Sequence, residues 1–161
     1  DHNGNVLLEH ESSSRQVMKT STAYLLTSAM QDTIVRGLGS TTQPAFLEYK
    51  MPIAGKTGTT SDYNDVWFSG YTPYYTASVW TGYDNNTKLR KGEERNLAKK
   101  LWRAAMSKIH EDLENTSFKM PTDGALVTAT VCSKSGKLPI AGWCDGCLTT
   151  EYFADKLESF L

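Results

Sequence analysis

The segment from residue 53 to residue 83 constrains the fold most, because it holds three runs rich in aromatic and β-branched residues with very short connections. The runs are Ile53–Thr59, Asp65–Tyr71 and Thr76–Tyr83. Parallel neighbours need a crossover of about a dozen residues or more, whereas a connection as short as Thr72-Pro73-Tyr74-Tyr75 turns one strand directly into the next. The sequence therefore predicts an antiparallel meander of three strands.

One helix is predicted before these strands and one after them. Apolar residues recur at helical spacing from Thr20 to Arg36, with Thr20 or Ser21 as the N-cap and Gly37 just past the C-terminal end. The second helix is predicted from Glu93 to Asp112, and acidic Glu93 and Glu94 suit its positively polarised N-terminal end. The apolar positions that define the two stripes are Ala23, Leu26, Met30 and Ile34, and then Leu97, Leu101, Ala105 and Ile109.

Smaller elements are expected at both ends of the chain. Asn3-Gly4 is a hairpin signal, and Val6-Leu7-Leu8 after it is typical of a strand. The residues from Glu114 to Asp123 indicate a loop or linker, and Ala125–Val131 alternates apolar and polar residues as a strand does. A further small and polar loop is expected from Gly37 to Gln43, followed by an irregular connection between Pro44 and Pro52.

Together these elements predict an α+β fold in which an antiparallel sheet is flanked by helices. We expect residues 1–113 to form one unit and residues 114–161 to form a linker and a small cysteine-containing tail. The first residue is not Met, and the chain starts within the predicted hairpin, so we expect it to have been cut from a longer protein.

Charge and hydropathy exclude several classes of protein. Lys and Arg number 17 against 18 Asp and Glu, and neither sign forms a long run, so no nucleic-acid partner and no polybasic membrane anchor are expected. No stretch approaches the ~18 uninterrupted apolar residues of a membrane-spanning helix, and the first residues lack the layout of a signal peptide.

Three cysteines, Cys132, Cys144 and Cys147, lie close together in a turn-rich segment. The spacing of Cys144 and Cys147 suits a thiolate metal site, but a closed zinc site needs a fourth ligand and no His lies nearby, so no metal is expected. A disulfide is the favoured alternative if the protein works outside the cytoplasm, and closing the loop from Cys132 to Cys144 would be worth about 3 kcal/mol. The odd number of cysteines leaves one of them outside any such pair.

The stretch with the clearest chemistry is Ala54-Gly55-Lys56-Thr57-Gly58-Thr59-Thr60. Strand side chains alternate between faces, so Lys56 and Gly58 point one way while Thr57 and Thr59 point the other. Hydroxyl donors beside an ammonium suit a carboxylate ligand, and a strand glycine allows a ligand to come close. The alternatives are an ordinary edge strand or part of a phosphate-binding loop. The loop is disfavoured because no Gly precedes Gly55 by five residues and strand-like sequence follows.

The order of three motifs resembles the transpeptidase domain of class A penicillin-binding proteins. The motifs are Gly55-Lys56-Thr57-Gly58-Thr59-Thr60, then Asp65-Val66-Trp67-Phe68-Ser69-Gly70-Tyr71-Thr72-Pro73, then Val79-Trp80-Thr81-Gly82-Tyr83-Asp84. The lysine-threonine-glycine triplet accompanies SxxK and SxN motifs in these enzymes and in their β-lactamase relatives. The preceding helix and the tail around Cys132 and Cys144 also look similar, so the resemblance covers nearly the whole chain, although Cys147 has no place in it.

The sequence departs from the family pattern in one major respect. No Lys has a Ser three residues before it, and no Ser-x-Asn occurs, so the acylating serine and its partners are expected to precede Asp1 in a longer protein. Residues 1–113 would then be the C-terminal half of the transpeptidase domain, in a serine transpeptidase or β-lactamase-like fold. The chain alone should be inactive.

The resemblance also implies the roles of the residues that are present. Lys56 would set the positive potential, and the N–H of Thr59 would supply one half of an oxyanion hole. The residues implied to bind substrate are Thr57, Gly58, Thr59 and Thr60. The implied partners are peptidoglycan stem peptides, β-lactams and the N-terminal remainder of the domain, and no cofactor is implied.

Two other functional classes remain beside this enzyme. One is a sensor module that binds β-lactam or muropeptide without turnover, and the other is a serine β-lactamase, which the sequence after Tyr83 disfavours. The resemblance implies a location at the extracytoplasmic face of the bacterial membrane, with the anchor outside this chain. His2, His10 and His110 are expected to have no catalytic part, since a general base must lie within reach of a substrate proton.

Overall fold

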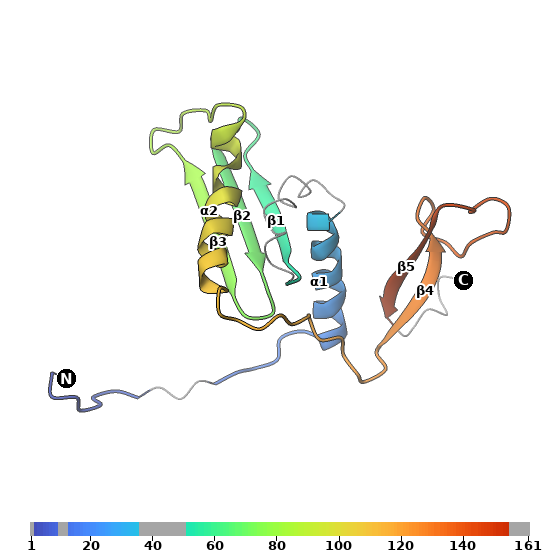
Figure 1. Ribbon diagram of the computed structural model, residues 1–161, viewed down its shortest axis with the longest axis horizontal. Coiled ribbons are helices and arrows are strands. Elements are labelled where there is room, and N and C mark those ends of the chain that lie inside the picture. The colour runs from blue at the N-terminus through green and yellow to red at the C-terminus, as the bar shows by residue number, and fades with distance from the viewer. Residues whose placement is uncertain (1, 10–12, 36–50, 155–161) are drawn as a thin grey trace.

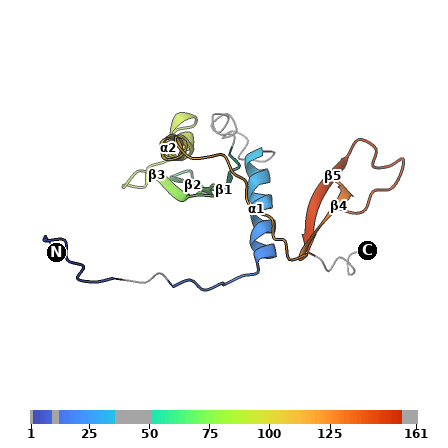
Figure 2. The same ribbon diagram turned by 60° about the horizontal axis from the view of Figure 1, so that its bottom comes forward.

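The computed structural model describes residues 2–9, 13–35 and 51–154. A three-stranded sheet carries α2 on one face and α1 beside its β1 strand, and a separate two-stranded hairpin lies on the far side of α1 (Figures 1 and 2). The structure therefore has antiparallel sheets flanked by helices, as the sequence predicts. No helix in the described residues is long and apolar enough to cross a membrane.

The predicted strand at Val6-Leu7-Leu8 is wrong. Residues 2–9 form no strand, and these three apolar side chains are exposed. A strand needs a neighbour to accept and donate its backbone hydrogen bonds, and neither sheet of the described residues extends to this segment. The strand propensity of these residues is therefore not supported by pairing with a neighbouring strand.

Helix α1, Thr20–Val35, is confirmed, but its predicted stripe is only partly right. Ile34 is buried as expected, whereas Leu26 is exposed. The helix is fixed to the sheet by polar contacts as well: Thr33 Oγ1 donates to the Gly55 carbonyl at 2.5 Å, and the hydroxyls of Thr27 and Tyr71 lie 2.9 Å apart. The predicted Gly37 cap, the loop to Gln43 and Pro44 lie outside the described residues.

The predicted meander is confirmed as β1 (Ala54–Thr59), β2 (Asp65–Tyr71) and β3 (Thr76–Gly82), in the order β1-β2-β3 with antiparallel pairing. Val66, Phe68 and Gly70 alternate with exposed residues along β2 and form its buried face. A Cβ at Gly70 would lie only 2.9 Å from Trp102 Cζ2, so glycine is needed there to admit the indole ring.

Helix α2, Glu93–Ile109, covers that buried face (Figure 2), but through a different stripe from the predicted one. Its buried residues are Ala98, Trp102 and Met106, whereas all four predicted positions, Leu97, Leu101, Ala105 and Ile109, are exposed. Both sets repeat every four residues and lie one residue apart, so periodicity alone cannot rank them. The indole of Trp102 decides the outcome because it meets Phe68 edge to face at 5.1 Å and donates to the Ala77 carbonyl at 2.9 Å.

His110 follows α2 directly and is structural. Its ring is buried, with Nδ1 2.8 Å from the Met106 carbonyl and Nε2 2.7 Å from the Thr72 hydroxyl. The same hydroxyl accepts the N–H groups of Tyr74 and Tyr75, each at 3.2 Å. His110 therefore ties the end of α2 to the turn between β2 and β3.

The C-terminal hairpin consists of β4 (Leu126–Cys132) and β5 (Leu148–Ala154). The first strand was predicted with slightly earlier bounds, and the second was not predicted. The hairpin contacts α1 through Tyr24 and Tyr152, whose rings meet edge to face at 5.3 Å. The division of the chain at residue 113 stays a prediction.

Candidate active-site strand

Strand β1 places Lys56 in a polar row on the exposed face of the sheet. Lys56 lies opposite Ser69, and Ser69 lies opposite Ser78, with the two serine hydroxyls hydrogen-bonded to each other. Directly opposed side chains share a face, so an exposed ammonium and two hydroxyls cross three strands side by side. Lys56 Nζ donates to the Thr57 carbonyl at 2.9 Å and has two further N–H donors. Ser69 and Ser78 were missed by the sequence analysis, although the short hairpin connections would have fixed this register.

Thr57 and Thr59 belong to the opposite face of β1. They lie opposite Phe68 and Val66, which point into the core under α2. Thr57 is half-buried, whereas Thr59, at the end of the strand, is exposed. The ammonium and these two hydroxyls thus come from one short strand but not from one face, so a ligand would have to meet them at the edge of β1.

Gly58 lies between the two threonines and opposite Trp67. A Cβ at this position would lie 3.2 Å from the Trp67 Cβ, closer than most such contacts. Glycine therefore serves the packing of Trp67, and it also leaves the strand without a side chain next to Lys56. Close approach of a ligand is compatible with this position, but the sheet supplies its own reason for the glycine.

Thr60 closes the turn between β1 and β2. Its hydroxyl oxygen accepts the N–H groups of Asn64 and Asp65, each at 3.0 Å, and its own N–H donates to the Asp65 carbonyl at 3.2 Å. Asp65 also accepts the indole N–H of Trp80 at 3.0 Å. These contacts hold the end of β1 in place, and the hydroxyl proton of Thr60 is still available for donation.

The three cysteines meet at the end of the β4–β5 hairpin. Their sulfur atoms all lie within 4.8 Å of one another, and Cys132 and Cys147 Sγ are 3.4 Å apart, although the pairing expected from sequence was Cys132 with Cys144. The Ser135 hydroxyl, with the backbone N–H groups of Ser135 and Lys134, lowers the pKa of the Cys132 thiol to about 6. The side-chain hydrogen bond with Cys132 raises the pKa of the Cys147 thiol, because it favours the protonated form of Cys147.

The fold matches a known structure. A solved structure of penicillin-binding protein 1A from Haemophilus influenzae superposes on 87% of this chain, and on 21% of its own, with a TM-score of 0.72 at 24% identity. The family model of the penicillin binding protein transpeptidase domain matches residues 7–107. The fold is therefore that of a serine transpeptidase. The chain belongs to the penicillin-binding protein transpeptidase family.

Relatives of known name agree with that assignment. Penicillin-binding protein 1A of Clostridium tetani is 33% identical over 159 residues, which is 96% of this chain and 20% of the relative. Penicillin-binding protein 1A of Clostridium botulinum (strain Langeland) is 36% identical over 86% of this chain and 16% of the relative. Penicillin-binding protein 1A/1B of Bacillus subtilis is 31% identical over 88% of this chain and 16% of the relative. The chain therefore spans about a fifth or less of the length of these relatives.

Proposed function

We propose that this chain is the part of a peptidoglycan D,D-transpeptidase that supplies the Lys-Thr-Gly strand of an acyl-serine active site. The observation that carries the proposal is β1 itself: a family-matched strand that offers an exposed ammonium, two hydroxyls and backbone donors at its end. Lys56 sets the potential for an anionic ligand, and Thr57 and Thr59 donate hydrogen bonds to its carboxylate. Gly58 and Thr60 keep this part of the strand accessible and in register.

The chemistry divides between two polypeptide segments. A serine outside this chain attacks the carbonyl carbon of the penultimate D-alanine and forms an acyl-enzyme, with loss of the terminal D-alanine. An amine of a neighbouring peptide then takes the acyl group and frees the serine. The N–H of Thr59 donates to the oxyanion that forms in each step, a contribution typically worth ~3 kcal/mol. A β-lactam forms the same acyl-serine bond. The site of action is the extracytoplasmic face of the bacterial membrane.

Labelling with a fluorescent penicillin tests the division of labour. The chain alone should give no covalent adduct, because it has no SxxK serine. Mixed with a polypeptide that carries SxxK and SxN, it should form a complex that labels on the partner's serine. A labelled band from this chain alone that survives denaturation would contradict the proposal.

Three substitutions at Thr59 separate the backbone donor from the hydroxyl. Thr59→Ser keeps both groups, Thr59→Ala keeps only the N–H, and Thr59→Pro removes both. Labelling rates should fall in that order, with Thr59→Pro lowest by about 100-fold or more. Size-exclusion chromatography of each mixture separates failed assembly from failed chemistry. Full labelling of an assembled Thr59→Pro complex would refute the oxyanion role. An assembled complex that labels but never transfers its acyl group to an amine would instead indicate a sensor.

A further inference from the structure

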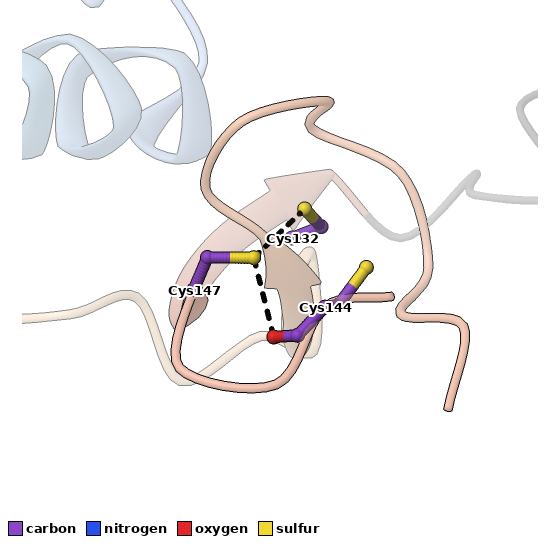
Figure 3. Close-up of side chains that lie close together, drawn as sticks. All are labelled: Cys132, Cys144 and Cys147. Atoms are coloured by element: carbon purple, nitrogen blue, oxygen red, sulfur yellow. Dashed lines mark hydrogen bonds between the residues drawn. The ribbon is translucent and has the colours of Figure 1, made fainter. Parts of the chain in front are cut away.

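Two turns bring the cysteine sulfurs together at the end of the C-terminal hairpin. Cys132 is the last residue of β4, and Cys147 directly precedes β5 (Figure 3). The Gly136 N–H donates to the Cys132 carbonyl at 2.7 Å, and the Cys147 N–H donates to the Cys144 carbonyl at 3.0 Å, so each turn is closed by its own backbone. The side chains of Cys132 and Cys144 are buried. The three cysteine sulfurs are thus held close together where β4 ends and β5 begins.

The separation of the sulfurs favours a metal site over a disulfide. A disulfide requires sulfurs about 2.05 Å apart. Two thiolates on one tetrahedral Zn²⁺, each with a bond of about 2.3 Å, lie about 3.8 Å apart. The Cys132 and Cys147 sulfurs are 3.4 Å apart, which is near the tetrahedral value, and all three sulfurs lie within 4.8 Å of one another. A disulfide would also use only two sulfurs and leave the third beside it.

The spacing of the residues gives the same answer. Cys144 and Cys147 have CxxC spacing, and Ser135 follows Cys132 at the same spacing. Paired CxxC turns are the usual ligand set of a zinc ribbon. We propose that Cys132, Cys144 and Cys147 bind a thiophilic divalent ion such as Zn²⁺ through three thiolates, with the fourth coordination position occupied by water or an external ligand. In the sequence pattern, Ser135 occupies the position of the fourth cysteine of a four-cysteine site. The sequence expectation of no metal rested on the missing fourth ligand, and a three-thiolate site does not need one from the chain.

Binding would join the end of β4 to the start of β5 through the ion. Each thiol that is still protonated loses its proton to solvent on binding, so affinity falls at low pH. Strand pairing already fixes both ends of the loop from Ser133 to Gly146, and the ion would also tether it at Cys144, so the loop should resist proteolysis better with the ion bound. This site is independent of the proposed transpeptidase function, since it lies in the hairpin and not on β1.

Cobalt titration of the full, reduced and metal-free chain tests the site. Co²⁺ should bind at one ion per chain, with thiolate-to-cobalt charge-transfer bands in the near ultraviolet and the visible bands of tetrahedral cobalt. Zn²⁺ should displace it. Cys144→Ser and Cys147→Ser should each weaken Zn²⁺ binding by at least about 100-fold, more than changes outside the ligand set usually do. Far-UV circular dichroism checks that each variant remains folded.

A second pair of variants tests for tighter Zn²⁺ binding, because unfolding could explain a loss of affinity but not a gain. Ser135→Cys completes two CxxC turns and should tighten Zn²⁺ binding by at least about tenfold. Ser133→Cys adds a fourth thiol at the wrong spacing and should not. Absence of thiolate-to-cobalt bands in the folded, reduced chain would overturn the proposal, as would equal gains from the two serine variants. A Cys132–Cys147 disulfide that forms with glutathione disulfide despite excess Zn²⁺ would also overturn it, in favour of a structural cross-link.

Discussion

Replacing Trp102 with alanine removes the largest fully buried side chain of α2 and tests which face of that helix packs on the sheet. The indole is 0% exposed, contacts Phe68 at 5.1 Å between ring centroids, and donates to the Ala77 carbonyl at 2.9 Å. Truncation of a buried tryptophan costs about 3–5 kcal/mol. This range includes the cost of leaving the Ala77 carbonyl without its donor, which is about 1–3 kcal/mol. We expect the free energy of unfolding to fall by about 4 kcal/mol.

Leu101 is the matched control, because it is the neighbouring residue and belongs to the stripe that was predicted from the sequence. Its side chain is 46% exposed, and alanine is at least as good a helix former, so Leu101→Ala should change the free energy of unfolding by less than about 1 kcal/mol. Urea denaturation of the full chain, followed by far-UV circular dichroism, measures both values. A loss for Leu101→Ala equal to that for Trp102→Ala would refute the assignment of the buried face.

Three further predictions concern single contacts. Thr72→Val removes the hydroxyl 2.7 Å from His110 Nε2 and should cost about 1–3 kcal/mol in the same urea assay; an unchanged midpoint would contradict the structural role of this pair. The side-chain hydrogen bond from Arg90 lowers the pKa of Glu94, so this carboxylate stabilises the fold above its ordinary pKa and stops doing so as the pH falls through the lowered value. Thermal unfolding should therefore show Glu94→Gln less stable than the parent at pH 7, with the difference closing below about pH 4. Lys56→Ala should slow acylation of the assembled complex by penicillin at least about tenfold while changing stability by less than about 0.5 kcal/mol, and equal acylation rates at matched stability would exclude the electrostatic role.

The sequence predicts the three-stranded sheet of this fold better than the faces of its helices. Short connections permit only antiparallel neighbours, so β1, β2 and β3 follow from local information. The buried face of α2 does not, because two apolar stripes lie about 100° apart and the choice depends on where Phe68 and Gly70 leave room for a ring. The strand β5 has the composition of a strand, with two threonines and two aromatic residues, but it has no regular alternation and directly follows the cysteine-rich turns, so it was not predicted.

The candidate site divides in the same way. The identity of Lys56, Thr57 and Thr59 as a ligand-binding set was readable from residue types and alternation, and it stays a prediction. Their neighbours depend on register: Ser69 and Ser78 join Lys56 only when three strands pair. The cysteine cluster depends on register too, since the return of the chain to Leu148 opposite Cys132 brings Cys147, and not only Cys144, to the end of β4.

Gly55 and Gly70 lie directly opposite each other, and each leaves space that an aromatic ring occupies. A Cβ at Gly55 would lie 2.8 Å from Phe68 Cζ, and one at Gly70 would lie 2.9 Å from Trp102 Cζ2. A methyl group at either glycine is therefore harmful while the rings are present, and a smaller ring is harmful while the glycines leave a void. Effects at such contacting positions are not additive. Related sequences should therefore change a glycine and its facing ring together. A smaller residue at Phe68 or Trp102 should come first, because it makes room for a side chain at the facing glycine.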